Sequence, residues 1–187
     1  STSSSATVTG LANGTAYVFR VAAINAAGTG SYSTPSTSVT PRTVPTAPLN
    51  LAGVKGDLQV SLSWDAPSDA GGASITDYAV EYSSNSGTSW TVFADGTSSL
   101  TSTTVTGLTN GTAYIFRVRA QNAAGLSTPS SSSSSVTPRT TPGAPTSLTG
   151  TRADNSVTLS WLAPSNNGGA SITDYAVEYS SNSGTSW

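Results

Sequence analysis

Apolar and polar residues alternate along several short segments of the chain. The clearest examples are residues 60–64, 78–82 and 114–120, in which every second residue is apolar. The side chains of a β-strand point alternately to the two faces of a sheet, so this pattern predicts short strands with one buried face. Clusters of Gly, Pro, Asn and Asp separate the segments, and none follows the 3.6-residue period of a helix. The chain is therefore predicted to be all-β.

The pattern recurs because the chain repeats itself every 97 residues. Residues 1–90 align with residues 98–187 without a gap, and 61 of the 90 pairs are identical. A period of this length is that of a small domain rather than of a solenoid repeat. The chain is therefore expected to be a window of an array of domains, in which seven residues resembling 91–97 would follow Trp187.

Several segments resemble, in order and spacing, the motifs of fibronectin type III domains. Residues 62–67 resemble strand B of that family, residues 71–82 its B–C loop and strand C, residues 108–114 its E–F corner, and residues 116–122 its strand F. The Gly-Gly pair in the B–C loop looks like the bacterial, secreted or surface branch of the family. The resemblance implies an immunoglobulin-like β-sandwich of seven strands, in which sheet A-B-E faces sheet C-C′-F-G.

The resemblance divides the chain into three parts. Residues 43–139 form one complete domain, residues 1–42 carry only strands E, F and G of the preceding domain, and residues 140–187 carry strands A, B, C and the start of C′ of the following one. Prolines border both linkers, so the domains should run head to tail as a semi-rigid rod. In the complete domain, strands A, B, C, C′, E, F and G are expected near residues 47–54, 58–65, 75–83, 89–94, 102–106, 113–122 and 130–138.

The inward-facing positions of these strands predict the hydrophobic core. Tyr114 stands where the resemblance places the tyrosine corner, which implies that its hydroxyl bonds to the backbone near Leu108 or Asn110. The expected core residues are Leu51, Val60, Leu62, Trp64, Ile75, Tyr78, Val80, Tyr82, Val105, Leu108, Tyr114, Phe116, Val118 and Ala120, with Trp161 as the counterpart of Trp64 in the next repeat.

Neither end of the chain holds enough strands to close a core. Each would leave an apolar face and open strand edges, which favour pairing. The C-terminal part of one copy is therefore expected to pack against the N-terminal part of the next, head to tail, in a continuous fibre. One long polypeptide, which the missing seven residues favour, or separate chains that complete each other's sandwich would both give this fibre.

Composition narrows the possible functions. The chain has no Cys and no His, charged residues amount to 9%, and the net charge is -2. The commonest general base, thiolate nucleophiles and the usual zinc ligands are therefore missing, and the charge argues against nucleic acid as a partner. No apolar run approaches the ~20 residues of a membrane span. No enzyme activity, cofactor or metal is expected, and low lysine with abundant Ser and Thr suggests an extracellular or cell-surface protein.

Acidic residues beside the B–C loop are the first candidate site. Asp65, Asp69 and Asp77 could together bind calcium. The next repeat has Leu162 and Asn166 at the first two of these positions, which favours solvated loop carboxylates.

A second set of charges lies on the outward face of strands C and F. Glu81 with Arg117 or Arg119 indicates a cross-strand ion pair rather than a catalytic pair. The many serines have no adjacent base that would activate a nucleophile, so no catalytic residue is assigned.

Three further features each have two interpretations. Asn13 and Asn110 begin formal glycosylation sequons, although a Gly-containing turn explains them without a sugar. Trp90 could be a platform for a sugar ring, although packing against Tyr82 or strand C is favoured. Residues 130–135 are Ser-rich like a linker, although their alignment favours strand G.

These observations favour a structural, non-catalytic array that forms a stalk, fibre or sheath at the cell surface. One alternative is a spacer in a secreted polysaccharide-degrading enzyme. Another is an adhesive module that binds a protein or glycan at the cell surface, although the F–G loop has no Arg-Gly-Asp tripeptide.

Overall fold

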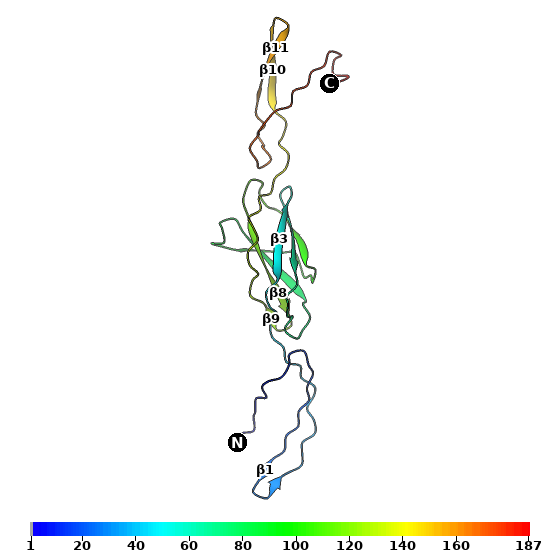
Figure 1. The fold of residues 1–187 in the computed structure, drawn as a ribbon, viewed down its shortest axis with the longest axis vertical. Helices are drawn as coiled ribbons and strands as arrows, with labels where there is room; N and C mark the ends of the chain where they lie inside the picture. Colours follow the sequence, from blue (N-terminus) through cyan, green and yellow to red (C-terminus); the bar gives the residue numbers. More distant parts are fainter. Residues whose placement is uncertain (1) are drawn as a thin grey trace.

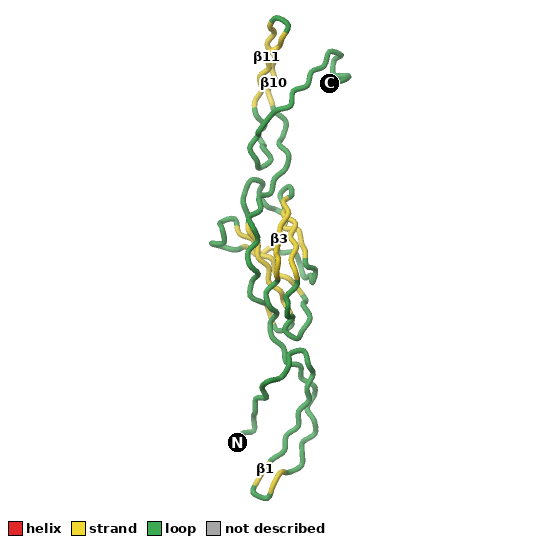
Figure 2. The backbone as a smooth tube through the Cα atoms, in the orientation of Figure 1, coloured by secondary structure: helices red, strands yellow, loops and turns green. Residues whose placement is uncertain are grey.

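The computed structural model describes residues 2–187 as three parts that follow one another along a single long axis (Figure 1). All regular secondary structure in these residues is β, with long irregular connections (Figure 2). The all-β prediction is confirmed. In the described part of the chain, no helix is long and apolar enough to cross a membrane.

The middle part is a sandwich of two antiparallel sheets. The first sheet has the order β3-β4-β7 and the second the order β6-β5-β8-β9. These are the sheets A-B-E and C-C′-F-G that the resemblance implied. The strands are β3 (Leu49–Lys55), β4 (Val60–Asp65), β5 (Asp77–Ser83), β6 (Thr91–Phe93), β7 (Ser102–Val105), β8 (Ile115–Asn122) and β9 (Gly125–Leu126).

The core of the sandwich comes from the alternating positions of its central strands. Every second residue of β4, and of β8 from Phe116 onward, is buried. Trp64 and Tyr78 face each other across the two sheets with ring centroids 5.3 Å apart. Leu51, Ile75 and Tyr82 are only half-buried at the rim of this core. Its buried members are Val60, Leu62, Trp64, Tyr78, Val80, Val105, Leu108, Tyr114, Phe116, Val118 and Ala120.

The turn before β8 is held by a tyrosine hydroxyl. The backbone N–H of Thr109 donates to the Tyr114 hydroxyl at 3.1 Å, between the two positions expected from the sequence. Ala12 and Tyr17 make the same bond at 3.0 Å one repeat earlier. The corner is therefore a property of the repeat rather than of one domain.

The predicted strand G at residues 130–138 is wrong as a regular strand. Only β9 and an isolated bridge between Tyr114 and Val136 are regular pairings here. In between, the segment advances three residues for every two residues of β8. The N–H groups of Ser127, Ser130, Ser133 and Val136 donate to the carbonyls of Ala120, Val118, Phe116 and Tyr114 at 2.8–2.9 Å.

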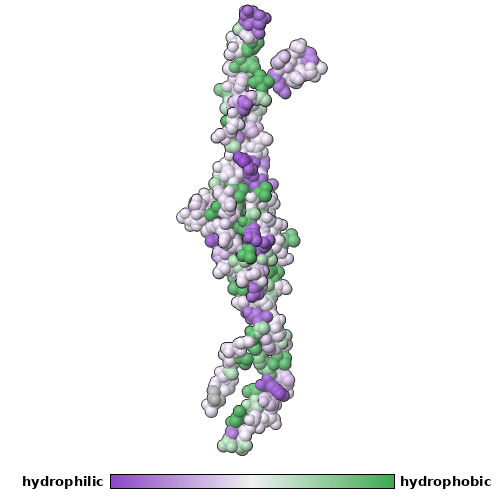
Figure 3. Space-filling view, in the orientation of Figure 1, coloured by the Kyte–Doolittle hydropathy of each residue, from purple (hydrophilic) through white to green (hydrophobic). Residues whose placement is uncertain are grey.

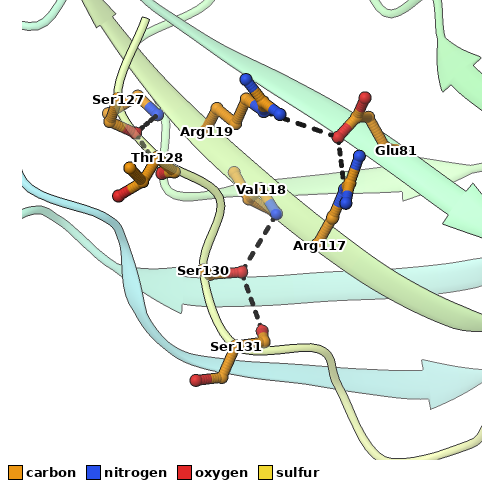
Figure 4. Close-up of polar contacts among 9 residues, drawn as sticks. Glu81, Arg117, Val118, Arg119, Ser127, Thr128, Ser130 and Ser131 are labelled. Atoms are coloured by element: carbon orange, nitrogen blue, oxygen red, sulfur yellow. Dashed lines mark hydrogen bonds and ion pairs between the residues drawn. The ribbon is translucent and has the colours of Figure 1, made fainter. Parts of the chain in front are cut away.

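The serine hydroxyls complete this pairing, which we call the serine ladder (Ser127, Ser130 and Ser133). The Ser130 Oγ accepts the N–H of Val118 at 3.1 Å and donates to the Ser131 carbonyl at 2.9 Å (Figure 4). The other two serines make equivalent bonds. A hydroxyl thus replaces the backbone carbonyl that a regular strand would offer, and all three serines are buried.

The two ends of the chain form fewer strands than expected. Residues 2–42 contain only β1 (Ile24–Asn25) and β2 (Gly28–Thr29), whereas residues 140–187 contain the hairpin of β10 (Thr146–Ala153) and β11 (Ser156–Leu162). β1 and β2 are the counterparts of the end of β8 and of β9, so only these short pieces of the expected strands F and G are regular. The expected strand E, and strand C after β11, are not formed. The reason is that a strand needs hydrogen-bonded neighbours, and in the middle part β5 and β8 supply them to each other.

Trp161 likewise departs from the predicted core. Its indole contacts Tyr175 with ring centroids 5.3 Å apart, as Trp64 contacts Tyr78, yet it remains only half-buried. No second sheet lies opposite the β10–β11 hairpin to cover it.

Truncation of the buried tryptophan should unfold the middle repeat. We expect Trp64→Ala to lower the free energy of unfolding by about 3–5 kcal/mol, because it leaves a large cavity between the sheets. Denaturant unfolding followed by circular dichroism measures this change. Trp161→Ala is the matched control, and an equal loss in both variants would contradict the assignment of the core.

The serine ladder can be tested one hydroxyl at a time. Ser130→Ala should destabilise the chain by about 1–3 kcal/mol, because the buried N–H of Val118 then loses its only hydroxyl acceptor. Ser131→Ala removes an exposed hydroxyl and should change stability by less than about 0.5 kcal/mol. Indistinguishable unfolding midpoints would show that the Ser130 hydroxyl contributes nothing.

Candidate functional site: the joint between repeats

The connection between successive repeats is bonded to both of them. At its start, the N–H of Gly14 in the E–F turn of the first repeat donates to the Pro41 carbonyl at 2.9 Å. Further on, the N–H of Thr43 donates to the carbonyl of Gly71 in the B–C loop of the second repeat, also at 2.9 Å. The linker is therefore tied down on both sides instead of hanging free.

A second connection repeats these contacts 97 residues later. Gly111 donates to the Pro138 carbonyl and Thr140 to the Gly168 carbonyl, each at 2.9 Å. The positions match those of the first connection one by one. We call each arrangement of E–F turn, linker and B–C loop a joint, and the two joints share these backbone hydrogen bonds.

A glycine of the B–C loop lets the repeats approach closely at each joint. It is Gly72 at the first joint and Gly169 at the second. Gly72 has a φ of +79°, and a Cβ placed on it would lie 2.7 Å from the Asn13 carbonyl carbon and 2.8 Å from the Asn13 Cβ. Gly169 has a φ of +84°, and the corresponding distances to Asn110 are again 2.7 and 2.8 Å. A larger residue would be strained by its backbone and would also push the repeats apart.

A buried asparagine holds the linker from the side of the second repeat. Asn122, at the end of β8, is 3% exposed. Its Nδ2 donates to the carbonyls of Thr43 at 2.8 Å and Ala70 at 2.7 Å, and its Oδ1 accepts the N–H of Ala124 at 2.8 Å. Asn25 occupies the same place one repeat earlier. The recurrence of Asn at this position was the signal in the sequence for the role of Asn122. The alternation of apolar and polar residues did not indicate that role.

The three aspartates considered for calcium have separate structural partners. Asp69 shapes the B–C loop through its Oδ1, which accepts the N–H of Gly71 at 2.8 Å, and Asn166 does the same for Gly168 at 2.9 Å. Asp65 accepts from an asparagine side chain, and Asp77 accepts two backbone N–H groups. Within residues 2–187, no group of three acidic, His or Cys side chains could hold a metal ion.

The side chain of Asn110 in the second sequon is already engaged. Its Oδ1 accepts the N–H of Leu58 at 3.0 Å, and its Nδ2 donates to the Asp57 carboxylate at 2.7 Å. Nδ2 is the atom that a glycan would modify. The turn interpretation of this sequon therefore has a structural basis.

The outward face of β5 and β8 carries the predicted ion pair. Arg117 Nε lies 2.6 Å from Glu81 Oε2, and Arg119 Nε lies 3.7 Å from the same oxygen (Figure 4). The Arg117 guanidinium also covers the ring of Trp90 at 4.2 Å from its centroid. Trp90 thus packs under an arginine of β8, which covers one face of its ring.

One hydroxyl of the core has a shifted pKa. Burial raises the pKa of the Tyr78 hydroxyl above its ordinary value, so this hydroxyl stays protonated at neutral pH. The feature of this geometry that recurs from repeat to repeat is the joint.

Comparison with known proteins agrees with this architecture. The family model of the fibronectin type III domain matches residues 1–39 and 46–137. Myomesin-2 of Homo sapiens is 33% identical over 143 residues, which cover 73% of this chain and 10% of that protein. Exoglucanase B of Cellulomonas fimi is 35% identical over 191 residues, which cover 94% of this chain and 17% of that protein.

A solved structure shows the same fold in tandem. A crystal structure of titin domains matches with a TM-score of 0.54 and 30% identity, over 68% of this chain and 42% of that one. The chain spans less than about a fifth of the length of the curated relatives named above.

A methyl group at the joint should change how the repeats are oriented. Gly72→Ala should alter the orientation of the second repeat relative to the first, because the new Cβ collides with Asn13. Residual dipolar couplings of the folded chain report this orientation. Gly96→Ala is the matched control: Gly96 has the same φ of +79° but nothing within 4 Å of the added Cβ. Equal couplings in the two variants would exclude a close-packed joint.

Proposed function

We propose that this chain, which belongs to the fibronectin type III family, is a structural, non-catalytic array of repeats that forms a stalk, fibre or sheath outside the cell. In this proposal residues 43–139 are one complete repeat, and residues 1–42 and 140–187 are parts of its neighbours. The working property of the chain is its shape, and no residue takes part in a reaction.

The likeness of the two joints carries this proposal. When successive joints share their backbone hydrogen bonds and their glycine contact, each repeat adds a similar displacement and rotation to the chain. A rod built in this way grows in length without changing direction at random. Such a rod suits a protein that sets a distance between two objects.

The composition of the chain supports an extracellular location. Few charges, a single lysine and many hydroxyls suit an extracellular bacterial protein, and the Gly-Gly form of the B–C loop supports the same origin. Localisation at the cell surface is part of the proposal.

A second candidate function uses the same rod inside a larger enzyme. Exoglucanase B of Cellulomonas fimi matches 94% of this chain, while the match occupies only 17% of that protein. In this alternative the repeats keep other domains of a secreted polysaccharide-degrading enzyme apart. The sequence that flanks the repeats distinguishes the two functions.

The rod can be measured directly in solution. For three parts of roughly 30–40 Å each, we expect a radius of gyration of about 30 Å, against about 16 Å for a compact domain of this length. Small-angle scattering, at concentrations where light scattering finds single chains, gives this value. A compact value would overturn the rod.

The cellular part of the proposal needs a separate measurement. Antibodies raised against the 187-residue chain should label the outside of intact cells of the source organism in electron micrographs. Label that appears only after the cells are opened would overturn the surface location.

A further inference from the structure

Positive charges are scarce in this chain, so the places where they recur are informative. Figure 3 shows a surface of mostly intermediate hydropathy, with strongly hydrophilic patches scattered along the rod. The basic residues are Arg20, Arg42, Lys55, Arg117, Arg119, Arg139 and Arg152. Lys55 and Arg152 occupy equivalent positions one repeat apart, and so do Arg42 and Arg139. Both positions therefore stay basic from one repeat to the next.

Lys55 and Arg139 line the same hollow of the middle repeat. This hollow has a volume of about 510 Å³ and lies between β3 and the segment that follows the serine ladder. Lys55 ends β3, and the N–H of Arg139 donates to the carbonyl of the next residue, Gly56, at 3.1 Å. We call this hollow the basic groove, and its lining includes Val54, Lys55, Ser135, Val136, Thr137 and Arg139.

The two cations of the basic groove have no carboxylate partner. Within residues 2–187, the ion pairs are those of Glu81 with Arg117 and Arg119 on the outward face of β5 and β8. The acidic residue nearest to Lys55 in the sequence is Asp57, whose Oδ1 accepts the Asn110 Nδ2 at 2.7 Å. Both cations of the groove are exposed. They can therefore meet an anionic group that arrives from solvent.

The rest of the lining suits a sugar ring. Val54 is 70% exposed, and Val136 is half-buried in the same hollow. Ser135 and Thr137 add hydroxyls to the lining. A sugar ring has apolar faces and a rim of hydroxyl groups, so it can pack on valine and form hydrogen bonds with hydroxyl side chains. A carboxylate on that ring would complement the two cations.

We propose that the basic groove binds an acidic polysaccharide through the carboxylates of its uronate sugars. The Arg139 guanidinium can hold a carboxylate through two parallel N–H bonds, and the Lys55 ammonium adds a second positive charge. This inference rests on the proposed extracellular function and deepens it, because it names the class of molecule that the rod contacts.

The recurrence of the basic positions makes a long polymer a better ligand than a single sugar. In an array, each complete repeat carries one groove, and the similar joints place successive grooves at similar intervals. A polymer bound at one groove raises the local concentration of carboxylates at the next. Weak single contacts then sum to firm attachment, which suits a surface rod embedded in a matrix of acidic polysaccharide.

Binding of polygalacturonate tests the proposal, because each of its sugar rings carries one carboxylate. Titration into the isotope-labelled 187-residue chain should shift the amide NMR signals of Val54, Lys55 and Thr137. The double variant Lys55→Gln/Arg139→Gln should bind about tenfold more weakly or worse, because both charge-assisted contacts are lost. Lys55→Arg keeps the charge and should retain binding. Dextran, a neutral polysaccharide, should leave these signals in place.

A charge-matched double variant separates the groove from the net charge of the chain. Arg20→Gln/Arg119→Gln also removes two positive charges, but neither residue lines the groove, so the affinity should stay within about twofold. Equal weakening by the two double variants would overturn the groove as the site. Polyglutamate carries carboxylates without sugar rings, and binding as tight as that of polygalacturonate would overturn the assignment of a polysaccharide. The scattering and labelling measurements do not depend on this binding, so the two proposals fail separately.

Discussion

The pairing of β5 with β8 is the interaction on which the rest of the repeat depends. It joins the first half of the repeat to the second over seven consecutive residue pairs, and it places Val80 beside Val118 at the centre of the core. β8 in turn supplies the backbone groups to which the serine ladder binds. Where this pairing is absent, at the two ends of the chain, strand C does not form and strand F is reduced to β1. Strand formation in this chain is therefore a tertiary event, as expected for short segments with little intrinsic stability.

The sequence predicted the features that depend on local alternation. The buried positions of β4 and β8 follow from a period of two, and that period is visible in one sequence. The make-up of the two sheets came from the resemblance to fibronectin type III domains. The serine ladder could not be predicted in this way. Its paired residues recur every three positions, whereas their partners in β8 recur every two. In the sequence, Ser130 and Ser133 therefore look like part of a low-complexity tract. The role of Asn122 could not be predicted for a different reason. The carbonyls to which its side chain donates lie 52 and 79 residues away in the sequence.

The glycines of the joint cannot be explained from the conformation of their own loop alone. Gly71 and Gly72 both have positive φ, and a turn alone would explain them. The structure adds a second requirement, because the space beside Gly72 is occupied by the E–F turn of another repeat. Only the recurrence of the Asn-Gly and Gly-Gly pairs at a spacing of 97 connects the two turns in the sequence. A contact between repeats is thus encoded by two short motifs, each of which looks like an ordinary loop.

Close identity between neighbouring repeats has a cost that the joints help to limit. Halves of identical repeats can exchange partners, and tandem arrays of similar domains are prone to this misassembly. In this chain the joint holds Thr43 against Gly71 and the E–F turn against Gly72, so adjacent repeats are kept end to end. The contacts that align the repeats along one axis therefore also oppose the exchange of halves between neighbouring repeats.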